Sequence, residues 1–304
     1  MGFRRYLGAF VGEAVRTMVD NQAKKLESMM MRSRANTKYI AITSGKGGVG
    51  KSSISANLAY KLNKLGFKVG VFDADIGLAN LDLIFGIKTD KNILHALRGE
   101  VGIDEVIYEI EPNLYLIPGD SGEEILKYAS NNLVERFIQD STVLDTLDFL
   151  LIDTGAGIGA LNQSTLQAAE HIIVITMPDP SAITDAYATI KLNSHTKSQI
   201  FMIINMCKNQ KEALSVFERM ENITRKHIPH LTLKYLGGLE NNSAVNKATR
   251  SRVLVSKVEP LNPVSIGLGD IAALLVSEIT DMEHNMLLEP KGFKRFFKRM
   301  LGYL

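Results

Sequence analysis

Residues 38–58 read KYIAITSGKGGVGKSSISANL, and this stretch decides how the middle of the chain folds. The apolar, β-branched run from Tyr39 to Thr43 predicts a buried strand. From Ser52 to Leu65 the apolar residues recur at helical spacing, and Gly66 ends that pattern. A glycine-rich loop lies between the two segments. The sequence therefore predicts a strand, a loop and a helix in direct succession.

The glycine-rich loop has the spacing of a phosphate-binding site. Gly45 and Gly50-Lys51-Ser52 fit the pattern G-x-x-x-x-G-K-[ST]. Glycines let backbone N–H groups approach phosphate oxygens, and the next helix adds the positive end of its dipole. We expect Lys51 to reach the β- and γ-phosphates of ATP and the Ser52 hydroxyl to bind Mg2+. The residues expected around the nucleotide are Gly47, Gly48, Val49, Gly50, Lys51, Ser52 and Ser53.

Composition limits the possible classes of protein. The chain has 304 residues, 45% hydrophobic and 22% charged, which suits one α/β domain with extensions or at most two domains. A net charge of +2 does not predict a specific nucleic-acid partner. The single cysteine, Cys207, excludes a disulfide framework. We expect no transmembrane span and no signal peptide, and therefore a cytoplasmic protein.

Apolar runs alternate with helical patterns along the rest of the chain. This alternation predicts a mostly parallel sheet with helices on both faces, an α/β three-layer fold. Ligands of such sheets bind at the carboxyl ends of the strands. The predicted strands after the first are 68–73, 114–117, 148–153, 171–177, 200–206 and 233–237.

Carboxylates stand at the ends of two predicted strands. One strand ends in Asp73-Ala74-Asp75, and the strand DFLLID ends in Asp153. A carboxylate after four apolar residues is a Walker B pattern, which in nucleotide-binding proteins helps hold Mg2+. Each aspartate alone could simply cap a turn, so the prediction depends on the phosphate loop nearby.

A second lysine, Lys46, gives the loop a special form, Lys-Gly-Gly-Val-Gly-Lys-Ser. This loop resembles that of the MinD/ParA deviant Walker A ATPases, which implies a P-loop NTPase fold of MinD type over 38–279. The resemblance implies that Lys46 acts across an ATP-bound homodimer, that Asp75 orients the attacking water and that Asp73 supports the Mg2+ shell. It also implies that Asn205 reads adenine. The alternatives are a purely local charge for Lys46 and a turn-capping role for Asn205.

Within that class, the chain is similar to the FlhG/FleN branch of flagellar number regulators. Gly155 stands where most MinD proteins have proline, and 176–191 (TMPDPSAITDAYATIK) also resembles the branch. The N-terminal NQAKKL (21–26) resembles a D-Q-A-x-x-L motif that stimulates the FlhF GTPase, which implies partner-binding roles for Gln22, Ala23 and Leu26. Asn21 and Glu27 depart from that motif. The alternative is a solvated or disordered lead.

The C-terminal sequence KGFKRFFKRMLGYL (291–304) has one apolar helical face and an otherwise basic surface. This pattern is typical of a helix that lies on an anionic membrane. The expected lipid-facing residues are Phe293, Phe296, Phe297, Met300 and Leu301. Two alternatives remain open: a tail docked on its own core, and a helix that contacts nucleic-acid phosphates.

Together these features predict three parts: a helical extension with a linker (1–36), a MinD-like ATPase domain (37–289) and an amphipathic helix (290–304). By resemblance, we expect a slow, regulatory ATPase that controls the number and placement of flagella. Its expected partners are a second copy, an FlhF-like GTPase, flagellar basal-body proteins and the inner face of the cell membrane in the ATP state. The alternatives are a MinD-type septum-placement ATPase and a ParA-type DNA-segregation ATPase.

Overall fold

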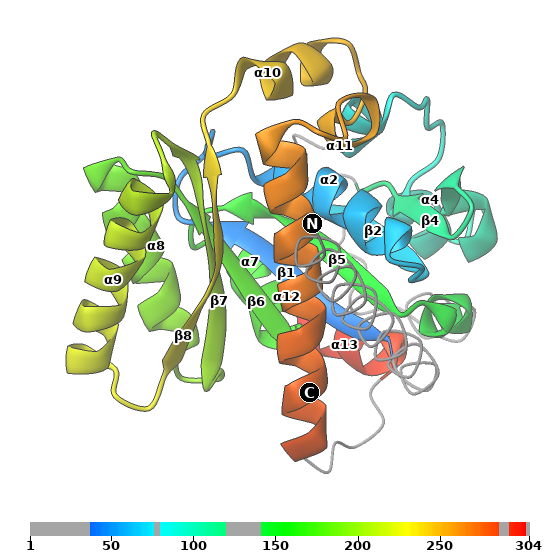
Figure 1. Ribbon diagram of the computed structural model, residues 1–304. Coiled ribbons are helices and arrows are strands. Elements are labelled where there is room, and N and C mark those ends of the chain that lie inside the picture. The colour runs from blue at the N-terminus through cyan, green and yellow to red at the C-terminus, as the bar shows by residue number, and fades with distance from the viewer. Residues whose placement is uncertain (1–36, 76–79, 120–140, 286–291, 302–304) are drawn as a thin grey trace, which may run out of the picture. The chain divides into compact units, whose positions relative to one another are not determined.

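The fold is a single eight-stranded sheet between helices, as the computed structural model in Figure 1 shows. The structure describes residues 37–75, 80–119, 141–285 and 292–301. The N-terminal extension, with Gln22, Ala23 and Leu26, lies outside the described residues. The strand order is β3-β4-β2-β5-β1-β6-β7-β8.

The seven strands predicted from apolar runs are all present and pair in parallel. They are β1 (Lys38–Ser44), β2 (Val69–Ala74), β4 (Leu114–Ile117), β5 (Phe149–Ala156), β6 (His171–Thr176), β7 (Gln199–Cys207) and β8 (Thr232–Glu240). The edge strand β3 (Tyr108–Glu111) was not predicted, and it runs antiparallel to β4. Its YEIE sequence is partly exposed and has no continuous apolar run, so the pattern of a buried strand is missing.

Helices cover both faces of the sheet (Figure 1). α2 and α12 pack against each other on one face, and α7, α8, α9 and α13 share a hydrophobic core with the other. The main helices are α2 (Lys51–Lys64), α7 (Ala160–Ala168), α8 (Pro180–Asn193), α9 (Gln210–His227), α12 (Pro263–Asn285) and α13 (Phe293–Met300). The shorter ones are α3 (Leu81–Phe85), α4 (Ile93–Leu97), α10 (Ser243–Arg250) and α11 (Val255–Val258), with 3-10 turns η1 (Ile103–Val106) and η2 (Ser141–Thr146).

Local signals explain where the best-defined helices begin. Asp179 accepts a hydrogen bond from the Ala182 N–H, and Pro180 occupies the first turn of α8. Asn209 caps α9 in the same way through the Glu212 N–H. Every residue of β1 is buried, as expected for the centre of a sheet covered on both faces.

The expectation that no segment has the length of a membrane span is wrong for α12. Residues Pro263–Asp281 are long and apolar enough to cross a bilayer by length and composition. However, Leu268, Ile271 and Leu275 are buried, and the helix packs on α2 and β8. Of this span, 44% is buried, and Ile266 and Leu274 are exposed, so one side of the helix belongs to the core and another does not.

Candidate functional site

The phosphate loop joins the end of β1 to the start of α2, as predicted. Gly48 and Gly50 have φ of 79° and 87°, a left-handed conformation that favours glycine. No atom lies within 4 Å of where a side chain would project from Gly47 or Gly48, so this side of the loop is open. The loop can therefore present its N–H groups to an anion at the start of α2.

Lys51 lies between two of the predicted carboxylates. Its side chain is only 7% exposed, and its Nζ is 3.0 Å from Asp153 Oδ1 and 3.7 Å from Asp75 Oδ2. These carboxylates supply the negative charge that phosphates would supply to the same lysine. The structure thus brings together the loop lysine, the end of β2 and the end of β5.

Asp153 offers one carboxylate oxygen to a magnesium ion. Its Oδ1 accepts hydrogen bonds from Lys51 and from Ser55, the latter at 2.8 Å. Its Oδ2 is buried and has no hydrogen-bond partner. A buried carboxylate oxygen without a donor is unfavourable unless a cation satisfies it, so Asp153 fits the Mg2+ site predicted with Ser52.

Asp75 directly follows β2 and lies beside Gly155, near the end of β5. A side chain on Gly155 would begin 3.2 Å from Asp75 Oδ1, so the two residues are near neighbours. Burial raises the pKa of Asp75, while nearby Lys51 lowers it and Asp153 raises it further. A half-buried carboxylate of raised pKa is suited to accept a proton or to orient a water molecule.

Asp73 anchors the chain that follows β2 through hydrogen bonds from the backbone. Its Oδ1 accepts the Asp75 N–H, and its Oδ2 accepts the Asn80 and Leu81 N–H groups. Burial and the charge of Asp153 raise the pKa of Asp73 to about 7 despite these bonds. The role of Asp73 in the Mg2+ shell stays a prediction, and the structure adds that backbone N–H groups already bond both of its oxygens.

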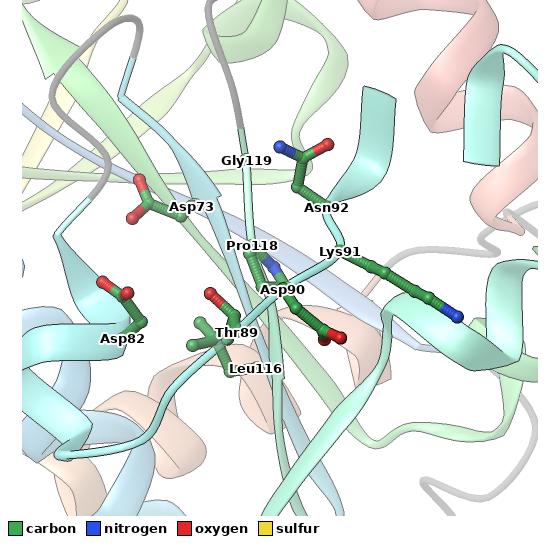
Figure 2. Close-up of a pocket in the computed structure, with 9 residues that line it drawn as sticks. All are labelled: Asp73, Asp82, Thr89, Asp90, Lys91, Asn92, Leu116, Pro118 and Gly119. Atoms are coloured by element: carbon green, nitrogen blue, oxygen red, sulfur yellow. The ribbon is translucent and has the colours of Figure 1, made fainter. Parts of the chain in front are cut away.

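A small pocket adjoins Asp73 on the side of β4 (Figure 2). Its lining includes Asp82 from α3, Asp90 and Lys91 from the segment before α4, and Gly119 after β4. A side chain on Gly119 would overlap the Asp73 carbonyl oxygen, so this close approach requires glycine. Among the described residues, no group of three or more His, Cys, Asp or Glu side chains could hold a metal ion.

Asn205 contacts the phosphate loop directly. Its Nδ2 donates a hydrogen bond to the Val49 carbonyl at 2.8 Å, and a side chain on Gly50 would begin 2.5 Å from the same nitrogen. The amide therefore fixes the loop from the end of β7. Its expected role in reading adenine remains a prediction.

Lys46 makes contacts within its own chain. Its Nζ lies 3.2 Å from Asp179 Oδ1 and 2.5 Å from Ser181 Oγ, at the start of α8. Hydrogen bonds from Ser181, the Ala182 N–H and Lys46 lower the pKa of Asp179 to about 2. The lysine is about two-fifths exposed, so this contact is readily exchanged for another anion.

Comparison with known proteins agrees with this geometry. A family model described as ParA, NUBPL iron-transfer P-loop NTPase, matches residues 35–275. The chain belongs to the ParA/MinD family of P-loop NTPases. It is therefore an ATP-binding protein and an ATPase, as predicted from the loop.

Three members of the ParA/MinD family illustrate the similarity. The flagellum site-determining protein YlxH of Helicobacter pylori is 52% identical over 94% of this chain and 100% of its own length. The antiactivator FleN of Pseudomonas aeruginosa is 30% identical over 89% of this chain and 95% of its own. The MinD structure in the Aquifex aeolicus MinC:MinD complex matches with a TM-score of 0.62 and 28% identity. The match covers 84% of this chain and 100% of the Aquifex chain.

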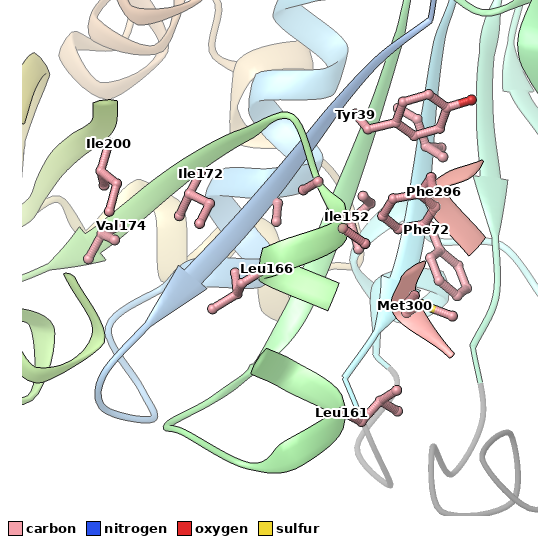
Figure 3. Packing of buried hydrophobic residues seen from close by; sticks show 14 of the residues in the cluster. Tyr39, Phe72, Ile152, Leu161, Leu166, Ile172, Val174, Ile200, Phe296 and Met300 are labelled. Atoms are coloured by element: carbon pink, nitrogen blue, oxygen red, sulfur yellow. The ribbon is translucent and has the colours of Figure 1, made fainter. Parts of the chain in front are cut away.

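The C-terminal helix of this ParA/MinD protein does not have a free apolar face. Phe293, Phe296, Phe297 and Met300 are all at most 3% exposed, and Leu301 is partly buried. Figure 3 shows Phe296 and Met300 among the strand residues Tyr39, Phe72 and Ile152. The Phe296 and Tyr39 rings are stacked, with their centroids 5.1 Å apart, and the Phe293 N–H donates a hydrogen bond to Asp145. The expected lipid-facing side is thus part of the core here, and the docked alternative describes this conformation.

Sequence reasoning missed several residues that complete the site. Ser55 bonds the Walker B aspartate, Asp179 holds Lys46, and Asn162 contacts the loop after β5. Ser55 lies one helical turn after Lys51, which is the one sequence signal that could have identified it. The other two belong to elements more than a hundred residues from the phosphate loop, and only the fold brings them close.

Proposed function

We propose that this ATPase regulates the number and placement of bacterial flagella. The observation that carries the proposal is the 52% identity to the flagellum site-determining protein YlxH across nearly the whole chain. The similarity to the antiactivator FleN supports the same assignment. The proposed partners are flagellar basal-body proteins and an FlhF-like GTPase, the latter contacted through Gln22, Ala23 and Leu26.

In the proposed hydrolysis, Lys51 exchanges its two carboxylate partners for the phosphates of ATP. Bound Mg2+, held by Ser52 and Asp153, would neutralise charge on the phosphates. Lys51 would then contact the β- and γ-phosphates in place of the two carboxylates. Asp75, released from Lys51, would orient the attacking water and accept its proton.

The proposed active form is a dimer closed around two ATP molecules. In that form Lys46 contacts the nucleotide of the second copy, much as an arginine finger does. Its present contacts with Asp179 and Ser181 are exposed and weak, so they would not prevent this movement.

Membrane attachment would depend on release of α13. The apolar side chains that would enter a bilayer are the ones now packed on Tyr39 and α7, so docking and membrane binding exclude each other. Arg295 and Arg299 lie on the exposed side of the docked helix, and after release they could contact anionic lipid headgroups. Two released helices on one dimer would bind far more strongly than one. The protein would thus be cytoplasmic as a monomer and peripheral to the membrane with ATP.

Sedimentation with anionic liposomes tests the membrane switch. We expect the Asp75→Ala protein to sediment much more with ATP than with ADP, because two helices act together only in the dimer. The double variant Arg295→Glu, Arg299→Glu should lose most of this binding at unchanged ATP affinity, since these side chains are exposed. Equal sedimentation with ATP and ADP would exclude the switch. Phe296→Glu is a poor probe, because Phe296 also belongs to the folded core.

The flagellar assignment is tested in the cell that makes the protein. Deleting the gene should change the number or position of flagella counted by electron microscopy, and the unmodified gene should restore both. The Lys51→Ala form should fail to restore them. Misplaced septa with normal flagella would favour the septum-placement alternative instead.

A further inference from the structure

One amide side chain connects residues 155–157, where β5 ends and the next loop begins, to the helix on which α13 docks. Asn162, in the first turn of α7, donates from Nδ2 to the Gly155 carbonyl at 3.0 Å and to the Gly157 carbonyl at 2.5 Å. Asn162 is only 6% exposed, so its side chain is almost fully buried. These two hydrogen bonds fasten residues 155–157 to α7.

This arrangement differs from ordinary helix capping. A capping side chain accepts hydrogen bonds from free N–H groups at the start of its helix. Asn162 instead donates to carbonyl groups of the loop that precedes the helix. Its Oδ1 is buried and has no hydrogen-bond partner, which is unfavourable for an acceptor. A different loop arrangement could give this oxygen a donor, so the present one need not be strongly preferred.

The loop fastened by Asn162 lies at the reaction centre. Gly155 adjoins the carboxylate of Asp75, and Gly157 donates its N–H to the Ser44 carbonyl at the start of the phosphate loop. Gly157 has φ of 86°, so the chain turns sharply at this point. A change in the position of Asp75 or of the phosphate loop would therefore displace residues 155–157 and, through its hydrogen bonds, Asn162.

The other end of this connection is the docked C-terminal helix. α13 packs mainly on α7 and η2. Leu161, adjacent to Asn162, belongs to the same core cluster as Phe296 and Met300 (Figure 3). A small rotation or shift of α7 would thus alter the surface that holds α13, because close-packed interiors transmit displacement.

We propose that Asn162 is a positioning residue that couples the nucleotide site to the docking of α13. Its two hydrogen bonds hold the loop and α7 in the arrangement that seats the helix. When ATP and the attacking water reposition the loop, these bonds are exchanged, α7 shifts and α13 is released. This inference rests on the proposed function, because it assumes that nucleotide controls the helix.

Hydrogen–deuterium exchange of residues 293–300, measured by mass spectrometry with ADP and with ATP, tests the coupling. A non-hydrolysable ATP analogue should replace ATP, so that the full chain keeps Asp75 and no hydrolysis occurs. With Asn162 intact, we expect ATP to speed exchange in α13. With Asn162→Ala, exchange with ADP should rise about tenfold, the effect of losing two hydrogen bonds, and the ATP–ADP difference should vanish. ATP affinity is measured separately, so that all variants are compared at saturating nucleotide.

Asn193→Ala is the matched control. Asn193 is also buried, donates to a carbonyl (Thr189, 2.9 Å) and has an unpaired Oδ1, but it lies at the far end of α8. This variant should keep the ATP–ADP difference. If Asn162→Ala does not fold, Asn162→Leu removes the same donor at similar size without adding a charge and should give the same result.

The outcomes separate the two proposals. If the Asn162 variants keep the full ATP–ADP difference in α13, the coupling role is excluded and the membrane switch stands. If the protein with Asn162 intact shows no such difference, both the switch and the coupling are excluded. If Asn193→Ala also loses the difference, the effect is general loosening of the fold, and the specific role of Asn162 is excluded.

Discussion

At the scale of single residues, the site is organised by a small set of charges around one lysine. Lys51 is buried beside Asp75 and Asp153, and a third aspartate, Asp73, is fixed by backbone N–H groups. Burial raises the pKa of both Asp73 and Asp75, and the charge of Asp153 raises them further, so three carboxylates lie close together at unfavourable cost. A magnesium ion relieves this crowding, so we expect metal and nucleotide to bind together.

A pair of substitutions separates binding from turnover at this site. Lys51→Ala should weaken ATP binding about 100-fold, because charge-assisted hydrogen bonds to two phosphates are lost. Asp75→Ala should retain binding but reduce the rate of phosphate release about 100-fold or more, since only the water is misplaced. Nucleotide titration and a steady-state phosphate assay measure the two effects, and removal of Mg2+ with EDTA should abolish turnover in every form. Normal turnover by Asp75→Ala would contradict its catalytic assignment.

At the scale of secondary-structure elements, α13 has the composition of a surface helix but the burial of a core helix. Its start depends on another element, because the Phe293 N–H donates to Asp145 in η2, which also accepts from the Tyr39 hydroxyl. A carboxylate at the N-terminus of a helix stabilises it through the free N–H groups and the helix dipole. Asp145 therefore favours the docked position.

Removing this carboxylate should favour release of the helix without nucleotide. Asp145→Ala should weaken docking by about 1 kcal/mol, roughly fivefold in the docking equilibrium, as for loss of an N-cap. More protein should then sediment with anionic liposomes in ADP, and proteolysis near α13 should be faster. Asp104→Ala, an exposed aspartate in η1, is the control and should change neither. Unchanged proteolysis in Asp145→Ala would show that aromatic packing alone holds the helix.

At the scale of the whole molecule, the parallel sheet gathers one functional residue from each of several strands at a single edge. The carboxyl ends of β1, β2, β5 and β7 deliver the phosphate loop, Asp75, Asp153 and Asn205 to the same place. The start of α8 adds Asp179 beside Lys46. The open side of the loop, at Gly47 and Gly48, is the surface on which a second copy would close.

Light scattering with ATP tests whether that surface forms a dimer. Asp75→Ala should be a dimer with ATP and a monomer with ADP, because trapped nucleotide holds the two copies together. Adding Lys46→Ala to it should return the protein to a monomer, since the proposed contact with the partner's phosphate is lost. Arg225→Ala, an exposed residue of α9, is the control and should leave the dimer intact. A full dimer without Lys46 would leave that lysine only a local electrostatic role.

The sequence by itself determined the seven parallel strands and the glycine-rich loop between β1 and α2. These features come from short-range physics: apolar runs, helical periodicity and the glycines that a phosphate needs are written within a few residues of one another. The tertiary structure alone decided that α13 is docked and that Lys46 contacts Asp179. An amphipathic helix has the same pattern whether protein or lipid covers it, so only its packing on Tyr39 and α7 could distinguish the two. Contacts between residues more than a hundred positions apart leave no local pattern, because the fold and not the neighbouring sequence brings them together.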